Sequence, residues 1–541
     1  MSTATQDTRT APAPPPSGSS PLEGFTHSLR SEATKLRTVR GWLVGLGVAA
    51  VLLVLLAALD ASGSHVQCGG PPAPKGSAGS GGAGRTPRSD EGCGGSSALP
   101  TGPGGDAVVD RAYLVDQTLS GNGSITARVT SLAGLLPEDA DGPEPWAKAG
   151  LIVKAGTTPG SSYAAVMVTG AHGVRLQDDF TNDVAGSAGA VSSASPRWLR
   201  LTRSGDRVTG YESADGTRWT ELGHADLTGL GTTATVGLFV ASPPHDETSY
   251  QFGGVSSDGG PSLARGGFDH VGLAGGWSGD TWRGELLGGA DDGPAAAHGP
   301  GAGFQQSAGG FTVTGYGDIA PAVGGLTGGI ERHLVGTFAA LLAAIVVGAM
   351  FGTSEYRRRL VRLTFAATPR RGQVLAAKAV VLAGVTFLVG AVGTVAALWV
   401  GHRLEGSRAV ALPTSTWVEV RVVAGTAAML ALAGVLALAA GTILRRSATA
   451  VALAISLVVL PYLLAVAVVL PIGAGEWLLR VTPAAAFAVQ QTLPPYHQVL
   501  AAYVPPLGYY PLPWWGGFAV LCAWTAGALA LATVVVRRRD A

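Results

Sequence analysis

The chain is poor in cysteine and in charged residues. Three cysteines occur in 541 residues, and only 13% of the residues are charged. No CxxC pair and no Cys/His cluster with zinc-ligand spacing is present, so we predict no metal site. The sequence also lacks the pattern GxxxxGK[ST], the Walker A loop that holds the phosphates of ATP. We therefore expect neither bound ATP nor an enzymatic activity of the ATPase kind in this chain.

The few charges that are present are unevenly distributed. Residues 61–330 carry 15 Lys and Arg against 26 Asp and Glu, a net charge of −11, whereas the rest carries 22 against 10, a net charge of +12. The basic residues lie at the ends of apolar runs, where the positive-inside rule places them in membrane proteins. This placement argues against a basic arm for nucleic acid, and we expect no nucleic-acid partner.

Long apolar runs dominate both ends of the chain. A membrane-spanning helix needs about 20 mostly apolar residues. Six segments meet this requirement: 42–59, 334–351, 374–400, 422–444, 450–470 and 514–536. Lys378 is a charge within them, and it lies near an expected inner end, where it can snorkel to the interface.

The basic residues agree on one orientation. They flank the apolar segments at Arg30–Arg40, Arg357–Arg371, Arg445–Arg446 and Arg537–Arg539, which alternate correctly for a common cytoplasmic side. Both termini are then cytoplasmic, and residues 61–333 are outside. A cleaved signal peptide is the alternative for the first segment, but its apolar core is longer than such peptides have. The preference for Arg over Lys and the abundance of Gly and Ala suggest a GC-rich bacterial genome, and we expect the protein in the bacterial plasma membrane.

The large insert reads as a linker followed by a β domain. Residues 68–103 are mostly Gly, Ser, Pro and Ala, a composition typical of disorder. Strand patterns then recur at 124–130, 146–154, 163–169, 198–202, 208–213 and 236–241, and Asp215-Gly216 predicts a hairpin turn. Many short strands separated by turns indicate a β-sandwich. Cys68 and Cys93 lie in the linker and could form a disulfide outside the cell, or remain two free thiols.

Two stretches of the insert, WAKAGLIVKAGTTPGSSYAAVMVT and PRWLRLTRSGDRVTGYESADGTRWTELG, resemble concanavalin-like, laminin-G-like jelly-roll modules of bacterial surface proteins. Such modules often bind glycans, and others are spacers. Trp146, Trp198 and Trp219 could form a ligand face by stacking on sugars, although tryptophan in a small sandwich usually belongs to the core. No closely spaced pair of carboxylates supports a glycosidase. The cluster Asp178, Asp179 and Asp183 could bind Ca²⁺, but a solvated acidic loop is the favoured interpretation.

The segment from Gly352 to Val381, GTSEYRRRLVRLTFAATPRRGQVLAAKAVV, carries the strongest functional signal. An acidic-aromatic pair follows the end of an apolar segment, and a basic amphipathic stretch comes next. Its apolar side chains can lie at the membrane interface while the arginines extend into water. Pro369 disfavours helical geometry in the residue before it, so we expect the helix to end near Thr368.

This segment resembles the permeases of ATP-binding-cassette exporters of the type-2 superfamily. In that family the second span is followed by Glu-Tyr-Arg, a short coupling helix and a Pro-Arg-Arg-like return. The N-terminal stretch 29–40 resembles the family's interfacial helix, and Thr482–Ala486 resembles the stretch before its final span. The ATPase-coupling loop that the resemblance implies comprises Glu355, Tyr356, Arg357, Arg358, Arg359, Arg362, Pro369, Arg370 and Arg371. The simpler interpretation of these arginines is that they keep the loop inside.

The resemblance implies partners. A separate ABC ATPase subunit would bind ATP, and a second permease copy or a paralogue would complete a dimer in membrane lipid. Two alternatives remain: a membrane-anchored surface protein that binds glycan or another envelope ligand through its sandwich, and a secondary transporter. The first leaves five spans unexplained. The second usually places ionisable residues at the bilayer midplane and carries internal repeats, and neither is apparent here.

The fold class predicted is thus an α-helical polytopic membrane protein with about six transmembrane helices and an inserted all-β jelly-roll or sandwich domain. We divide the chain into a cytoplasmic tail with an interfacial helix (1–40), a first transmembrane helix (41–60), a flexible linker (61–105), an extracytoplasmic β-sandwich (106–256), a Gly-rich stalk or accessory strands (257–333) and five further transmembrane helices (334–541).

Overall fold

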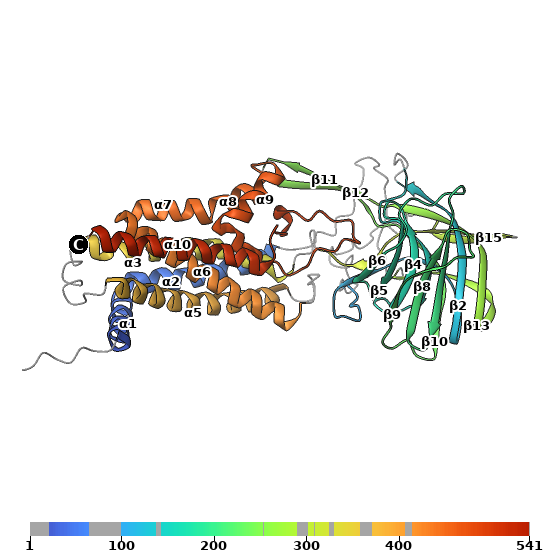
Figure 1. Ribbon diagram of the computed structural model, residues 1–541, viewed down its shortest axis with the longest axis horizontal. Helices are drawn as coiled ribbons and strands as arrows, with labels where there is room; N and C mark the ends of the chain where they lie inside the picture. Colours follow the sequence, from blue (N-terminus) through green and yellow to red (C-terminus); the bar gives the residue numbers. More distant parts are fainter. Residues whose placement is uncertain are drawn as a thin grey trace, which may run out of the picture.

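The computed structural model describes residues 21–63, 99–136, 142–252, 254–288, 301–307, 309–323, 329–357, 371–405 and 414–539. Figure 1 shows a bundle of long helices at one end of the long axis and a β domain at the other. The chain enters the β domain after the first long helix and leaves it before the second. The β domain is therefore an insert in the helical bundle, as predicted.

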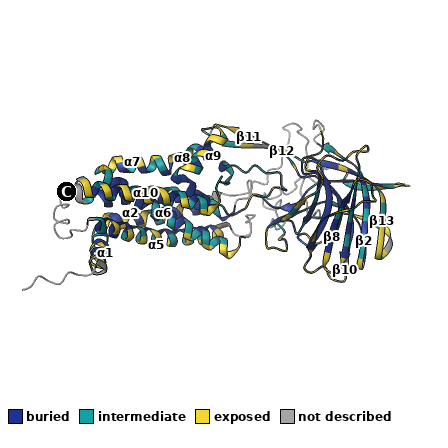
Figure 2. Cartoon of the chain, viewed as in Figure 1, coloured by how far each residue is buried: buried dark blue, intermediate teal, exposed yellow. Residues whose placement is uncertain are grey.

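Six helical segments in the described part of the chain are long and apolar enough to cross a membrane. They match the six predicted apolar segments. They comprise α2 (Arg40–Gly63), α3 (Thr337–Arg357) preceded by the 3₁₀ turn η1 (Ile330–Leu334), α5 (Arg371–Glu405), α6 (Thr416–Leu444), α7 (Ser447–Val458) continued by α8 (Leu460–Val466), and α10 (Trp514–Arg539). Many apolar residues on their outward surfaces are exposed. Figure 2 shows exposed residues along α2, α5 and α7.

Helix α6 forms the centre of the bundle. Sixteen of its residues are buried, and it packs against α3, α5, α7 and α10. The crossing with α3 is especially close, because a Cβ atom on Gly348 would lie 2.1 Å from the carbonyl oxygen of Gly434. Gly352 makes a similar approach to Leu438, at 2.6 Å. Gly348 and Gly352 are four residues apart, the spacing by which small residues bring apolar helices together.

The fifth apolar segment differs from the single helix expected over 450–470. It breaks at Val459, where α7 gives way to α8, and Pro461 occupies the first turn of α8 without a backbone N–H to donate. A further helix, α9 (Ile472–Val481), and the 3₁₀ helix η3 (Pro483–Gln490) follow. Every residue of η3 is buried, and η3 packs against α10 and α6. The turn η4 (Pro505–Leu507) lies in the segment that leads to α10.

The β domain contains sixteen strands in the described residues. They are β1 (Val108–Asp110), β2 (Tyr113–Leu136), β3 (Lys148–Lys154), β4 (Tyr163–Thr169), β5 (Val174–Asp178), β6 (Asn182–Ala185), β7 (Arg197–Ser204), β8 (Arg207–Ser213), β9 (Thr220–Asp226), β10 (Thr233–Ala241), β11 (His245–Gln251), β12 (Gly254–Gly260), β13 (Leu263–Leu286), β14 (Gly303–Ser307), β15 (Gly310–Gly315) and β16 (Ile319–Pro321). All six predicted strand segments coincide with strands.

The long strand β2 joins two sheets, and the equally long β13 lies beside it. The first half of β2 pairs with β10 and the second half with β7, while β13 pairs antiparallel with β2 along nearly its whole length. One sheet thus runs β6-β5-β4-β3-β10-β2, and we call it the β3 sheet. The other runs β9-β8-β7-β2-β13-β15-β14, and we call it the β7 sheet. Because β2 belongs to both, the twelve strands form one continuous sheet that folds into a nearly closed sandwich.

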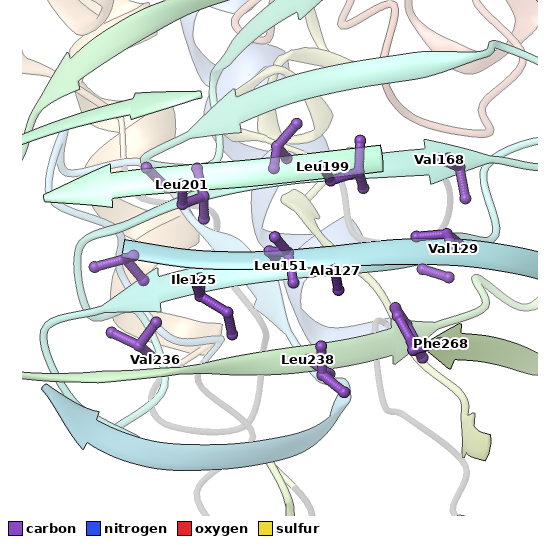
Figure 3. Close-up of a cluster of buried hydrophobic side chains, with 14 of the residues drawn as sticks. Ile125, Ala127, Val129, Leu151, Val168, Leu199, Leu201, Val236, Leu238 and Phe268 are labelled. Carbon is purple, nitrogen blue, oxygen red and sulfur yellow. The ribbon is translucent and has the colours of Figure 1, made fainter. Parts of the chain in front are cut away.

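The space between the two sheets is filled by aliphatic side chains. Leu151 and Val168 from the β3 sheet face Leu199 and Leu201 from the β7 sheet, and Phe268 closes one side (Figure 3). All five are 2% exposed or less. Burial of each such side chain contributes about 1.5–3 kcal/mol to the folding free energy, so this layer is the main source of stability of the sandwich.

The predicted boundary of the sandwich at residue 256 is wrong. Strands β13 and β15, within the predicted Gly-rich stalk or accessory strands, belong to the β7 sheet and contribute Phe268, Phe311 and Val313 to its core. The glycines there reflect close packing: a Cβ on Gly310 would lie 2.2 Å from the carbonyl oxygen of Phe268, and one on Gly315 would lie 2.2 Å from that of Val240. Only residues without a side chain fit such contacts.

Candidate functional site

The end of the helical bundle away from the sandwich is built around α1 (Pro21–Thr38), which lies across the axis of the other helices (Figure 1). Glu32 of α1 is 2% exposed, and its carboxylate lies 2.6 Å from the Lys35 ammonium and 3.9 Å from that of Lys378 on α5. The Lys378 ammonium also lies 5.3 Å from the centre of the Phe351 ring on α3. Lys378 is therefore buried in an ionic contact with α1.

These contacts fix the two helices from which the predicted coupling loop extends. Glu355, Tyr356 and Arg357 form the last turn of α3, and Arg371 begins α5, although their side chains lie outside the description. The other predicted loop residues, Arg358, Arg359, Arg362, Pro369 and Arg370, lie outside the described residues. The turn Arg445–Arg446 and the end of α10 lie at the same end of the bundle, since successive long helices alternate in direction.

An apolar cavity of about 570 Å³ lies between α6, α7 and α10. Leu436, Leu457 and Leu531 line it, one from each helix, and Trp524 contributes an indole ring. The Trp524 ring N–H donates to the carbonyl oxygen of Val481, 2.9 Å away. With walls of this kind the cavity can hold hydrocarbon and little else.

Aromatic side chains fill the bundle near the start of α3. The rings of Tyr462 and Phe487 are 4.0 Å apart, and Phe338 stacks on Phe487 at 5.2 Å. The Tyr510 hydroxyl lies 3.3 Å from that of Tyr462. Beside them, the buried Gln490 side chain donates to the hydroxyls of Thr337 and Thr426. This cluster packs η3 firmly against α3, α6 and α8.

The segment between η3 and α10 connects the bundle to the sandwich. The Gln498 side-chain amide donates to the carbonyl oxygens of Phe180 and Thr181, at 3.3 and 3.0 Å, in the turn between β5 and β6. Leu493 packs in an apolar cluster with Ala107 and Ala322, which flank β1 and β16. The sandwich is therefore in contact with the segment between η3 and α10, which continues directly into α10.

The two ends of the insert pair with each other and cover the outer face of the β3 sheet. β1 and β16 are antiparallel neighbours, and two buried ion pairs tie them to β3. The Lys154 ammonium lies 2.7 Å from the Asp110 carboxylate, and the Lys148 ammonium lies 2.5 Å from that of Asp318. Burial lowers the pKa of Lys154, and the Asp110 carboxylate opposes that shift. No local sequence pattern indicated these pairs, because their partners are far apart along the chain.

The three tryptophans of the predicted ligand face are separated. Trp146 is 4% exposed and stacks on the His172 ring at 4.0 Å, so it belongs to the core. Trp198 and Trp219 are half-buried. Trp198 and Arg200 lie on the outer face of the β7 sheet, because Leu199 between them points inward, and Trp219 packs against Arg200 there. The Arg200 guanidinium lies 3.8 Å from the centre of the Trp219 ring and covers one face of it.

The predicted acidic loop is part of a strand pair. Asp178 and Asp183 belong to β5 and β6, and Asp183 forms an ion pair with Arg175. Asp179 accepts hydrogen bonds from the Ser162 hydroxyl and the Tyr163 backbone N–H, at 2.6 and 3.1 Å. Within the described residues no group of three or more His, Cys, Asp or Glu side chains is placed to hold a metal ion. Cys68 and Cys93 lie outside the described residues.

One further carboxyl in the β3 sheet has a strongly shifted pKa. Burial, and then the negative charge of Glu285, raise the pKa of Asp116 to about 6, while the Arg283 guanidinium acts in the opposite direction. The Arg283 guanidinium lies 3.8 Å from the Asp116 carboxylate. Asp116 lies on β2 and Glu285 on the neighbouring strand β13, so the two carboxyl groups influence each other across a strand pair.

No family model and no curated protein matches the chain. Among solved structures, the GH43 protein BlXynB from Bacillus licheniformis is 15% identical, with a TM-score of 0.16, over 22% of this chain and 24% of that one. Scytalido-glutamic peptidase is 9% identical, with a TM-score of 0.24, over 39% and 100% of the two chains. A functionally unknown protein from Saccharomyces cerevisiae is 14% identical, with a TM-score of 0.19, over 29% and 71%. Likenesses this weak carry no argument about activity.

Proposed function

We propose that this chain is the membrane subunit, or permease, of an ATP-binding-cassette export system in a bacterial plasma membrane. The helical bundle crosses the membrane six times, and the β-sandwich is a jelly-roll module on the outer side. A separate ATPase subunit hydrolyses ATP and moves the helices by pushing on the loop between α3 and α5. A second permease copy or a paralogue completes the transporter.

The observation that carries the proposal is the shared placement of the basic segments and α1. Four Arg-rich stretches adjoin helix ends on one side of the bundle, opposite the sandwich. This arrangement follows the positive-inside rule for a six-span protein with cytoplasmic termini. On that side α1 lies across the bundle, as an interfacial helix would, and its Glu32 contacts Lys378 of α5.

The cavity between α6, α7 and α10 supports a hydrophobic cargo. Its lining consists of aliphatic side chains and one indole ring, with no charged residue among them. A cargo with an acyl or other hydrocarbon part could occupy it from the bilayer. A strongly polar solute would find no hydrogen-bond partners there and would lose several kcal/mol of solvation.

Replacement of Arg358, Arg359 and Arg362 together by Gln tests the docking role. If each arginine contributes about 1 kcal/mol at the subunit interface, their loss weakens ATPase binding by roughly a hundredfold. The measurement is the amount of ATPase subunit that co-purifies with the variant, together with the ATP hydrolysis of the purified complex. We expect both to fall to background while the chain still inserts.

The matched control replaces Arg537, Arg538 and Arg539 by Gln. These three residues end α10 on the same side of the bundle, so the control removes the same charge from the same face. It should keep the ATPase subunit bound. Full retention of the subunit and its activity by the loop variant would show that the loop does not dock an ATPase.

A second candidate function is ligand binding by the sandwich. The observation that favours it is that Trp198 and Trp219 share the outer face of the β7 sheet with Arg128 and Arg200. Half-exposed rings beside guanidinium groups can bind a glycan or another envelope ligand. Binding of cell-envelope glycan by the full-length protein, lost when both tryptophans are replaced by Ala, would support this function.

A further inference from the structure

The hairpin of β11 and β12 stands apart from both sheets of the sandwich. Its two strands pair only with each other among the described strands, from His245 opposite Gly260 to Gln251 opposite Gly254. Figure 1 shows the hairpin running from the sandwich back along the long axis of the molecule, as far as α8 and α9. Its far end thus reaches the level at which the long helices end on the sandwich side.

The far end of the hairpin is aromatic and uncharged. Phe252, which follows the last residue of β11, is 83% exposed, and Tyr250 is 38% exposed. Tyr250 lies opposite Val255 on β12. From Thr248 to Ser256 the sequence contains no charged residue. Exposure of a phenylalanine ring to water at the tip of a projecting hairpin is unfavourable, and covering the ring with another apolar phase would stabilise it.

The root of the hairpin is fixed to the sandwich on both strands. The His245 ring Nδ1 lies 2.8 Å from the Glu144 carboxylate, and Glu144 is buried. After β12, the Ser262 hydroxyl donates to the hydroxyl of Ser242, 2.7 Å away. These contacts hold both strands where they leave the sandwich and so set the direction of the hairpin.

We propose that the tip of this hairpin binds the outer leaflet of the membrane that the helical bundle crosses, with Phe252 and Tyr250 at the boundary between headgroups and acyl chains. Aromatic side chains are enriched at that boundary, where a ring is covered by hydrocarbon and a hydroxyl still meets water. The inference rests on the membrane crossing in the proposed function and is independent of export and of any ATPase partner.

The charges on the hairpin limit how deeply it enters. Glu247 is exposed and lies opposite Asp258, four residues before Gln251. Four residues of a strand span about 13 Å, so the Glu247 carboxylate meets the lipid surface once the tip has entered by that amount. The tip therefore binds shallowly. Trp477 on α9, 63% exposed, is a second aromatic residue near the same end of the bundle.

The experiment places a fluorescent reporter beside the tip without removing its rings. In a full-length chain carrying Cys68→Ser, Cys93→Ser and Cys522→Ser, Gln251→Cys is labelled with an environment-sensitive dye. The protein is reconstituted in nanodiscs of phosphatidylethanolamine and phosphatidylglycerol, one chain per disc, with or without lipid that carries a nitroxide at its headgroup. We expect the nitroxide to quench roughly half of the emission, as for a group held at the interface.

Two comparisons complete the test. Adding Phe252→Ser to the labelled chain should abolish most of the quenching, and a dye at Thr217→Cys, on an exposed turn of the β7 sheet, should not be quenched. Quenching at residue 251 that is equal with and without Phe252, or absent in both, would overturn the proposal. So would a dye that is shielded only when two chains share a disc, because the tip would then bind a second copy. Stable incorporation of the chain into nanodiscs tests whether the helical bundle crosses the membrane. Failure of the membrane crossing can therefore be distinguished from failure of lipid binding by the hairpin tip.

Discussion

At the scale of single residues, the two lysines at the ends of β3 are the least expected feature. Lys148 and Lys154 are fully buried. Lys148 pairs with Asp318, the residue before β16, and Lys154 pairs with Asp110 of β1. From the sequence, lysines flanking an apolar run look like solvated strand ends. Instead, the two lysines form buried ion pairs with aspartates that are 170 and 44 residues away along the chain, which no local sequence pattern indicates.

Asp110→Ala should be strongly destabilising, because it leaves the Lys154 ammonium buried without its carboxylate. We expect a loss of about 3–5 kcal/mol in the opening free energy of β3 and β4, measured by amide hydrogen exchange on the full-length protein. The double variant Asp110→Leu with Lys154→Met should recover most of that loss. Asp226→Ala, which breaks the exposed pair with Arg207, should cost far less, because water screens that pair. Equal effects of the two alanine variants would contradict the account.

The raised pKa of Asp116 predicts a pH dependence with a defined sign. The folded state holds this proton more tightly than the unfolded chain, whose carboxyl titrates near pH 4. The contribution of the Asp116 proton to the free energy of unfolding is therefore complete below about pH 4 and is lost as the pH rises through about 6.

Asp116→Asn should remove this dependence and stabilise β2 and β13 at pH 7 by on the order of 1 kcal/mol. The measurement is the ratio of hydrogen-exchange protection in variant and wild type at pH 4.5 and pH 7, values chosen to lie about 1 unit or more from the midpoint. The ratio cancels the intrinsic pH dependence of exchange. A ratio that does not change with pH would show that Asp116 titrates normally in the folded protein.

At the scale of elements, the sequence predicted the apolar helices and the regular strands well, and the glycine-rich strands poorly. The alternating pattern at 124–130 identified part of β2, because one face of that strand points into the core. Apolar runs identified β3 and β4, in which every residue is buried. β13 has glycine where neighbouring backbones approach, so it has little alternation and was predicted to be a stalk or accessory strands. Gly348 and Gly352 on α3 carried a readable signal for the contact with α6.

The segment between η3 and α10 is the element that joins sandwich and bundle. Leu493→Asp should weaken this joint, because a carboxylate would replace a side chain packed against Ala107 and Ala322. We expect faster hydrogen exchange in residues 99–112 and unchanged exchange in β3 and β10. Gln498→Ala should have a smaller effect of the same kind, since it removes two hydrogen bonds and no apolar contact. If exchange in residues 99–112 is unaffected by both variants, the sandwich is held by other contacts.

At the scale of the whole molecule, composition and the distribution of arginines were enough to predict a helical bundle interrupted by a β-sandwich. They were not enough to identify the candidate cavity or the joint between the two parts, which depend on how helices pack. The break at Val459 was not predicted from the apolar run 450–470. The return of η3 into the bundle was not predicted either, because a buried 3₁₀ helix is as apolar as a membrane-spanning helix. The coupling role of Glu355 to Arg371 stays a prediction.

The most direct test of the permease proposal is purification of the tagged full-length protein from its own cells in mild detergent, with identification of every chain that co-purifies. The account predicts a stoichiometric partner that contains a Walker A sequence and hydrolyses ATP. Recovery of the protein alone or with envelope glycan, under conditions in which a control transporter keeps its ATPase, would contradict the account and favour a surface-binding role.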